Sequence, residues 1–182
     1  VFYSRSYTPR RAVALGFAAF EELARRRSDF VVQMFGEDEA GKHFDFPNEQ
    51  MGILSPEVLG DLYRDADLGV SFSTTNYSLV PLEMMACGLA VVEIDSPSAR
   101  TAFPHGTLSF AKPSPIAVAD AIEQLLDDAE ARERQLTAAG EFVACLDWED
   151  SARAIEAAIT ERLSEQGFEG IDARTLTPAL HL

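Results

Sequence analysis

Short runs of β-branched and aromatic residues alternate with stretches of helical periodicity along most of the chain, which predicts strands alternating with helices. From Val13 to Leu23 apolar residues recur at helical spacing, for example, and predict a helix over residues 10–27. The other predicted helices cover residues 55–64, 79–86, 115–128, 130–143 and 148–165. The predicted strands cover residues 1–4, 30–35, 50–53, 68–72, 90–94 and 107–110.

This alternation predicts the fold class and the domain boundaries. It implies an α/β, Rossmann-like, doubly wound parallel sheet of about six strands flanked by helices. With 182 residues, 47% of them hydrophobic, the chain has enough material for one domain core, which we place at residues 1–166. The apolar periodicity fades over residues 167–182, so we expect a loosely held tail there. Because the chain begins inside a predicted strand without a methionine, we interpret it as part of a larger protein.

The charge of the chain is unevenly distributed. A net charge of −15 argues against a nucleic-acid-binding surface. The first 27 residues, however, hold six arginines and two glutamates, which leaves about +4 there and about −19 over the remainder. Three of these arginines, at 25–27, close a predicted helix and complement its dipole. The other three, Arg5, Arg10 and Arg11, are candidates for binding a small polyanion.

Residues 68–94 read as strand, polar loop, helix and second buried strand. Loops at the carboxyl edge of a parallel sheet are where α/β proteins bind phosphorylated ligands. Ser78 is the predicted N-cap of the helix, and Pro81 fits its first turn. Glu83 lies about one turn further in, where a carboxylate suits hydroxyl groups rather than phosphate. This combination is typical of a nucleotide diphosphate site, with Glu83 accepting hydrogen bonds from a sugar diol.

The same loop and helix resemble the donor-binding signature of the group 1 retaining glycosyltransferases of the GT-B fold. That signature runs Glu-x-Phe-Gly-Leu-x-x-x-Glu, followed by a short helix and Ala-Cys-Gly. Here residues 75–83 read TNYSLVPLE and residues 84–88 read MMACG, so Glu83 matches the second glutamate. Thr75 replaces the first glutamate and Ser78 replaces the glycine. The run VPLEMMACG is similar to a bacterial branch that includes rhamnosyltransferases. The alternative is an ordinary strand–loop–helix of another Rossmann-like sheet.

The resemblance implies that the chain is the C-terminal, donor-binding domain and that the N-terminal acceptor domain is absent. The full enzyme would move a sugar from a nucleotide diphosphate to an acceptor hydroxyl with retention, in surface polysaccharide or glycan synthesis. In that reading the donor sugar and phosphates meet Thr75, Asn76, Tyr77, Ser78 and Leu79, the ribose meets Glu83, and Leu54 borders the base. The resemblance assigns no catalytic nucleophile or base to this half, and no cofactor or metal. We expect the fragment alone to be inactive.

The loop RSYTPRR, residues 5–11, resembles a second element of the family, Gly-Arg-Leu-x-x-x-Lys-Gly, which grips the diphosphate. Arg5 falls on the arginine and Arg10 on the lysine; the role of Arg11 stays open. A guanidinium can bind phosphate through two parallel hydrogen bonds, whereas lysine acts as a point charge. The alternative, solvent-facing arginines at a helix start, is disfavoured because the N-terminal end of a helix repels cations.

Two motif matches are rejected. Residues 36–43 match most of a P-loop, but they lack its Ser/Thr and carry three carboxylates that would repel phosphate. The motif Asp65-Ala66-Asp67 resembles a metal-binding D-x-D, yet it precedes a strand, at the wrong edge of a parallel sheet. The three histidines are scattered and suggest no metal cluster.

Other functional classes remain open. One is a different enzyme of the same fold, such as a nucleotide-sugar epimerase or a phosphorylase, although nothing resembles a pyridoxal phosphate site around Lys42 or Lys112. Another is a non-catalytic nucleotide-binding module, which the change at Thr75 makes conceivable. No run of about twenty apolar residues is present, and two cysteines give no disulfide framework, so we expect a cytoplasmic protein. Any peripheral membrane association is expected only through the absent domain.

Overall fold

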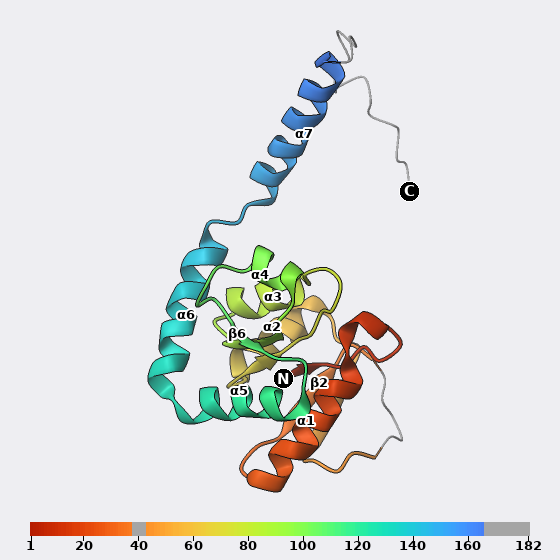
Figure 1. Cartoon of the computed structure of the whole chain (residues 1–182), viewed down its shortest axis with the longest axis vertical. Helices are drawn as coiled ribbons and strands as arrows, with labels where there is room; N and C mark the ends of the chain where they lie inside the picture. Colours follow the sequence, from red (N-terminus) through yellow and green to blue (C-terminus); the bar gives the residue numbers. More distant parts are fainter. Residues whose placement is uncertain (38–42, 166–182) are drawn as a thin grey trace. The chain divides into compact units, whose positions relative to one another are not determined.

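The computed structural model describes residues 1–37 and 43–165 (Figure 1). Its helices and strands alternate along the chain nearly as the sequence predicts. In chain order they are β1 (Phe2–Tyr3), the 3-10 turn η1 (Pro9–Arg11), α1 (Val13–Arg26), β2 (Val32–Phe35), β3 (Asn48–Gly52), α2 (Pro56–Asp65), β4 (Gly69–Val70), α3 (Val80–Ala86), β5 (Val91–Ile94), α4 (Pro97–Ala102), β6 (Ser109–Ala111), α5 (Pro115–Asp127), α6 (Ala129–Ala144) and α7 (Trp148–Glu165).

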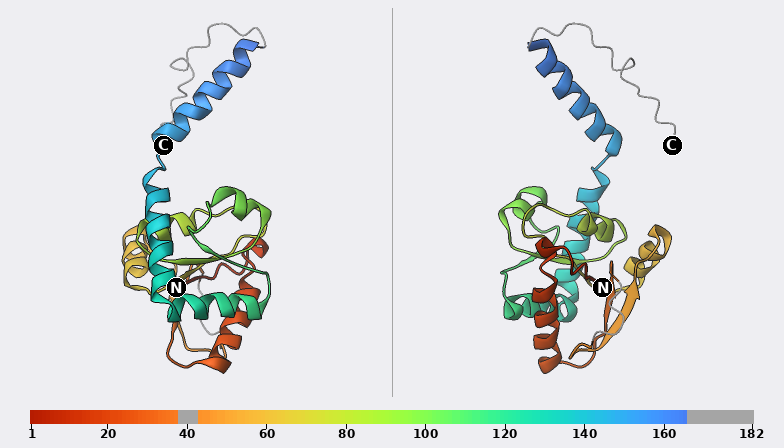
Figure 2. Two further views of the ribbon diagram at one scale, coloured as in Figure 1. Left: turned by 60° about the vertical axis from the view of Figure 1, so that its left-hand side comes forward. Right: turned by 90° about the vertical axis from the view of Figure 1, so that its right-hand side faces the viewer.

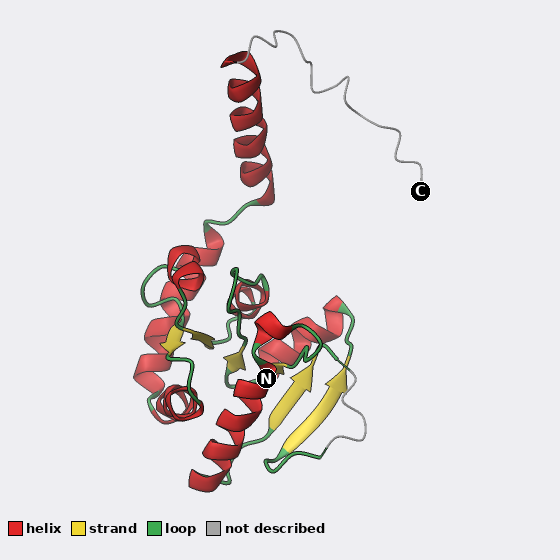
Figure 3. Cartoon of the chain, turned by 45° about the vertical axis from the view of Figure 1, so that its right-hand side comes forward, coloured by secondary structure: helices red, strands yellow, loops and turns green. Residues whose placement is uncertain are grey.

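The six strands form one parallel sheet in the order β3-β2-β1-β4-β5-β6 (Figure 3). Phe2 of β1 pairs with Met34 of β2 on one side and with Val70 of β4 on the other. The chain therefore winds outward from β1 in one direction and from β4 in the other. This arrangement confirms the predicted Rossmann-like, doubly wound sheet, and it places the switch in winding direction between β1 and β4.

Helices cover both faces of the sheet. On one face α1 and α5 pack side by side, and their apolar residues, such as Leu23 and Ile122, share a core cluster with Phe2 (Figures 1 and 2). On the other face α2, α3 and α6 contribute Leu62, Met84 and Ala139, among others, to a second cluster. The loop after β1 therefore leads to a helix on one face, and the loop after β4 to a helix on the opposite face.

Serine followed by proline begins three of the helices. The hydroxyls of Ser55, Ser96 and Ser114 each accept a hydrogen bond from the backbone N–H three residues further on, at 3.2–3.5 Å. Proline at the first helical position fits because its missing N–H would have no partner there. The second of these helices, α4, is absent from the predicted elements, although it carries the same start signal.

The prediction of a continuous helix from residue 10 is wrong. Residues 9–11 form a 3-10 turn, Ala12 adopts a left-handed conformation with φ of 45°, and α1 begins at Val13. The break frees the carbonyl of Arg10, which accepts hydrogen bonds from the backbone N–H of Thr74 at 2.9 Å and from its hydroxyl at 3.2 Å. A contact between distant loops thus replaces a hydrogen bond within the helix.

The chain divides into two compact units, Val1–Ala144 and Cys145–Leu182. The first contains the sheet and α1 to α6. Within the second, the described part of α7 has no buried residue, and Ile155 and Ile159 are more than half exposed. The domain boundary predicted at residue 166 stays a prediction, and the predicted tail lies outside the described residues. No helix in the described part of the chain is long and apolar enough to cross a membrane.

Candidate functional site

The loops that follow β1 and β4 meet at the carboxyl edge of the sheet. Besides the two bonds from Thr74 to the Arg10 carbonyl, the guanidinium of Arg10 donates to Oδ1 of Asn76 at 3.3 Å. Arg10 thereby meets Thr74 and Asn76, which follow it by 64 and 66 positions in the sequence, and the three residues form one site at the switch point between β1 and β4. Crevices at such switch points are the usual ligand sites of open α/β sheets. The structure thus brings together two of the predicted site residues, Arg10 and Asn76.

The β1 loop is held by hydrogen bonds to its own tyrosines and to the β2 loop. Arg5 donates to the hydroxyls of Tyr7 and Tyr3 and stacks on the Tyr7 ring, 4.8 Å from its centroid. The bonds to Tyr3 and then to Tyr7 raise the pKa of Arg5. Ser6 donates both its N–H and its hydroxyl to the Glu37 carboxylate. Arg5 remains exposed, and its charge faces solvent at the rim of the site.

The six arginines near the start of the chain fall into two groups of three. Arg25, Arg26 and Arg27 all form ion pairs with nearby carboxylates, which confirms their structural role at the end of α1. In contrast, none of the loop arginines at positions 5, 10 and 11 lies within 4.0 Å of a carboxylate oxygen among the described residues. Burial lowers the pKa of Arg11, and the positive charges of Arg10 and Arg5 lower it further. Within the described part of the chain, a cluster of positive charge without carboxylate partners therefore borders the crevice.

The loop after β4 begins with buried residues and continues with exposed polar side chains. Thr75, Asn76 and Tyr77 are exposed, and the Thr75 hydroxyl donates to Oδ1 of Asn76 at 3.1 Å. The Tyr77 ring meets Phe103 edge-on at 6.4 Å. Because Asn76 Oδ1 accepts from both Thr75 and Arg10, it links the predicted sugar loop to the predicted phosphate loop.

The start of α3 differs in detail from the prediction. Leu79, which is 46% exposed, flanks the helix, while Ser78 is buried and one residue further from it. The Ser78 hydroxyl still accepts from the N–H of Val80 at 3.2 Å. At its other end α3 ends at Ala86. Two residues later Gly88 has φ of 77°, which allows the N–H of Leu89 to reach the carbonyl of Met84. With only seven residues, α3 offers little dipole, so the arginines are the main positive groups here.

Glu83 and Leu54 lie on the α2 and α3 side of the sheet. Glu83 is exposed in the first turn of α3. Burial of the Tyr63 hydroxyl, together with the nearby Glu83 carboxylate, raises the pKa of that tyrosine. Leu54 follows β3 and packs against the apolar cluster that contains Tyr3 and Tyr63. The binding roles of the predicted site residues stay predictions.

Three residues near the site were not predicted: Glu37, Tyr63 and Glu93. Glu93 is fully buried in β5, and its Oε1 accepts from the backbone N–H of Ser73 at 2.9 Å, at the root of the β4 loop. A carboxylate inside an otherwise apolar strand, AVVEI, was the signal that could have identified it.

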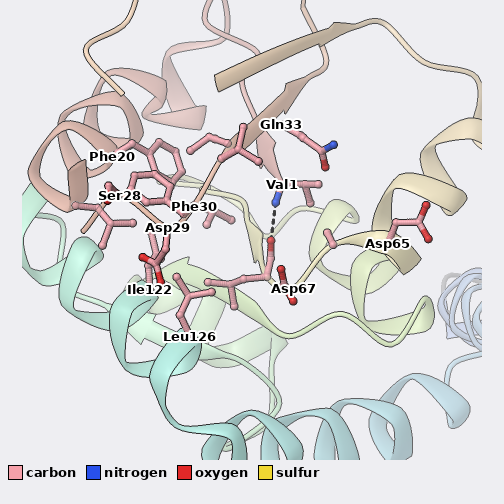
Figure 4. A pocket seen from close by; sticks show the side chains of 16 residues that line it. Val1, Phe20, Ser28, Asp29, Phe30, Gln33, Asp65, Asp67, Ile122 and Leu126 are labelled. Atoms are coloured by element: carbon pink, nitrogen blue, oxygen red, sulfur yellow. Dashed lines mark hydrogen bonds between the residues drawn. The ribbon is translucent and has the colours of Figure 1, made fainter. Parts of the chain in front are cut away.

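A cavity of about 570 Å³ lies at the opposite, amino edge of the sheet (Figure 4). Its wall includes Phe20, Ile122 and Leu126 from the helices, and the Val1 amino group bonded to the Leu68 carbonyl at 2.6 Å. Asp65 and Asp67 line it as well, so the D-x-D motif lies away from the site, as the topology predicts. Among the described residues no group of three His, Cys, Asp or Glu side chains could hold a metal ion.

Solved structures with the same architecture identify the class of fold. The chain resembles the sucrose-phosphate synthase of Thermosynechococcus elongatus, with a TM-score of 0.72 and 19% identity over 90% of this chain and 45% of that one. It also resembles the Anabaena protein HepE, solved in complex with UDP-glucose, with a TM-score of 0.69 and 19% identity over 90% of this chain and 48% of that one. The fold is that of the C-terminal half of a GT-B glycosyltransferase.

The chain belongs to the family of WsaF C-terminal domains, whose model matches residues 1–123. It is also 34% identical, over 158 residues, to the O-antigen biosynthesis protein RfbC of Myxococcus xanthus. That match covers 81% of this chain but only 12% of RfbC, and the two solved chains are less than half covered. The chain is thus a glycosyltransferase-like domain that spans a fraction of the proteins it matches.

Proposed function

We propose that this domain binds the nucleotide-sugar donor of a glycosyltransferase that builds an O-antigen or related surface polysaccharide. The observation that carries the proposal is the junction of the two loops, where Arg10 donates to Asn76 and is one of three loop arginines without an ion pair to a carboxylate among the described residues. Such a junction in a chain of net charge −15 selects a small polyanion over a large one. The WsaF family, the name of RfbC and the UDP-glucose bound to HepE support the choice of a nucleotide sugar.

In this proposal the chain contributes electrostatics and positioning. Arg5 and Arg10 neutralise the diphosphate and stabilise the negative charge that develops as it leaves. Glu83 accepts hydrogen bonds from the ribose diol, and the β4 loop holds the sugar. The acceptor hydroxyl is held by a second domain outside this chain, and transfer proceeds with retention at the anomeric carbon. No step needs a metal ion.

The donor sugar we propose is a 6-deoxyhexose such as rhamnose. Thr75 stands where the resembled signature has a carboxylate, and its single hydroxyl already donates to Asn76. A short neutral side chain offers fewer hydrogen-bond acceptors, which suits a sugar with fewer hydroxyls. Calorimetric titration with dTDP-, UDP- and GDP-linked sugars tests this point, because tighter binding of a UDP-hexose would contradict it.

The binding function itself is tested by titrating the 182-residue chain with dTDP, UDP and GDP. We expect one of these to bind, and we expect Arg10→Ala to weaken it by about 1.5–3 kcal/mol, as for loss of a charge-assisted hydrogen bond. The matched control is Arg25→Ala, which removes an exposed arginine that is paired with Glu22 on α1. Absence of heat with all three nucleotides would favour a non-catalytic module. Equal losses in both variants would show that Arg10 acts only through general charge.

A further inference from the structure

A buried polar cluster lies beneath the two loops, and its central residue is Glu93. The carboxyl group is fully buried in β5. Its Oε1 accepts from the backbone N–H groups of Ser73, at 2.9 Å, and Ile94, at 2.8 Å. Its Oε2 has no hydrogen-bond partner among the described residues. Glu93 therefore fixes Ser73 near the start of the β4 loop, while one of its two carboxyl oxygens has no partner within the described residues.

Arg11 supplies the opposite charge. Its Nε and Nη1 atoms are buried and lack hydrogen-bond partners in the described part of the chain, and its guanidinium lies 5.1 Å from the centroid of the Tyr3 ring. The Ser71 hydroxyl is likewise buried and unpartnered within the described residues. Phe2 pairs with Val70 and Val70 pairs with Val92, so the residues that follow them, Tyr3, Ser71 and Glu93, have side chains on one shared face of the sheet.

Several buried polar atoms of this cluster form no hydrogen bond with another described residue. Burial raises the pKa of Glu93 to about 8, against the opposing effects of its two backbone hydrogen bonds and of Arg11. Among the described residues Arg11 is the charged group that acts on Glu93, and Arg5 and Arg10 act in turn on Arg11. At neutral pH the carboxyl group is therefore mostly protonated, and within the described part of the chain no ionised carboxylate then pairs with Arg11.

We propose that Glu93 is a positioning residue of the donor loop and that a nucleoside diphosphate binds to this site together with a proton on Glu93. The inference rests on the proposed function. The carboxyl group anchors the Ser73 N–H, and through it the loop that carries Asn76 to Arg10. In its protonated form it does so without adding a negative charge beneath the diphosphate.

The coupling follows from electrostatics in a poorly solvated region. A bound diphosphate near Arg10 and Arg11 disfavours a second negative charge at Glu93, so binding raises the pKa of the carboxyl group further. By linkage the protein then takes up a proton on Glu93 when the nucleotide binds near pH 8, and the affinity for the nucleotide falls as the pH rises. If binding raises the pKa by one unit or more, Kd increases about five- to tenfold between pH 7 and pH 9, with uptake of about 0.4 proton at pH 8.

Calorimetry on three proteins tests the proposal: the parent chain, Glu93→Gln and Glu93→Ala. Each is titrated with dTDP, UDP and GDP at pH 7, 8 and 9, in buffers of different ionisation enthalpy that report proton uptake. Glutamine keeps an acceptor for both N–H groups and stays neutral, so Glu93→Gln should bind with a Kd that changes less than twofold with pH, and without the extra proton. Alanine removes the anchor, so Glu93→Ala should bind more weakly than Glu93→Gln at every pH.

The outcomes separate this inference from the proposed function. If no nucleotide binds the parent chain at any pH, the proposed function fails and the inference fails with it. If the parent chain binds but Glu93→Gln shows the same pH profile and the same proton uptake, the inference alone is overturned. A Glu93→Ala variant that binds as tightly as the parent at pH 7 would overturn the positioning role. If Glu93→Ala does not fold, the comparison of Glu93→Gln with the parent decides by itself.

Discussion

Replacing Glu93 by glutamine should stabilise the protein at alkaline pH and leave its stability almost unchanged at acidic pH. The pKa of this carboxyl group is raised from 4.5 to about 8 by burial in β5. The folded protein therefore keeps a proton that the unfolded chain has lost between these two values. The stability contributed by this proton is complete below pH 4.5 and is lost progressively as the pH rises through 8.

The magnitude follows from the size of the pKa change. At about 1.4 kcal/mol per unit, the whole effect is about 4–5 kcal/mol, most of which develops between pH 5 and pH 8. Glutamine does not titrate, so the variant escapes this loss. We expect Glu93→Gln to match the parent within about 1 kcal/mol at pH 5 and to exceed it by about 3–4 kcal/mol at pH 9.

Urea unfolding followed by circular dichroism, at several pH values between 5 and 9, measures the difference directly. Glu83→Gln is the matched control, because it makes the same substitution at an exposed carboxylate on α3; its effect should stay within about 0.5 kcal/mol throughout. A difference between parent and Glu93→Gln that does not change with pH would refute the reasoning. It would mean that Glu93 is charged when buried and is fully compensated by Arg11.

Three further predictions concern the site and the loop beside it. Glu83→Gln should weaken binding of both nucleoside and nucleoside diphosphate, measured by calorimetry, because in the proposed function Glu83 accepts hydrogen bonds from the ribose; a loss confined to the diphosphate would place Glu83 at the phosphates instead. Gly36→Ala should lower the free energy of unfolding by about 2 kcal/mol or more, because Gly36 has φ of 101° and a Cβ there would lie 2.5 Å from the Tyr3 ring. An assay of sugar transfer by the 182-residue chain should show no turnover, because nothing in the proposed site holds the acceptor; substantial turnover would contradict the half-enzyme interpretation.

The sequence predicts the sheet well because the pattern that it encodes is local. Parallel strands buried on both faces give continuous apolar runs, and helices such as α1 and α5 give an apolar stripe at 3.6-residue spacing. The meeting of the loops after β1 and β4 also follows from alternation, since carboxyl ends of parallel strands lie at one edge. The structure brings the two predicted loops together through the hydrogen bond from Arg10 to Asn76, a contact that the sequence analysis does not predict.

What the sequence could not predict depends on contacts between distant residues. The break at Ala12 coincides with the hydrogen bonds from Thr74 to the Arg10 carbonyl, and apolar periodicity carries no information about them. The burial of Glu93 is a property of the finished sheet, because it depends on β4, β5 and the helices that cover them. Helix α4 is different, because Ser96 followed by proline repeats the start signal of α2 and α5 and could have been recognised.

The departures from local rules are concentrated at one place in the molecule. Ala12 takes a left-handed conformation, and around the loops after β1 and β4 the side chains of Arg11, Ser71 and Glu93 have buried polar atoms without a hydrogen-bond partner among the described residues. Each of these features costs free energy of folding, and none adds to either apolar core. A module that kept only the fold could replace these polar groups by apolar ones and become more stable. Their concentration at the switch point therefore supports the proposal that this site binds an anionic ligand.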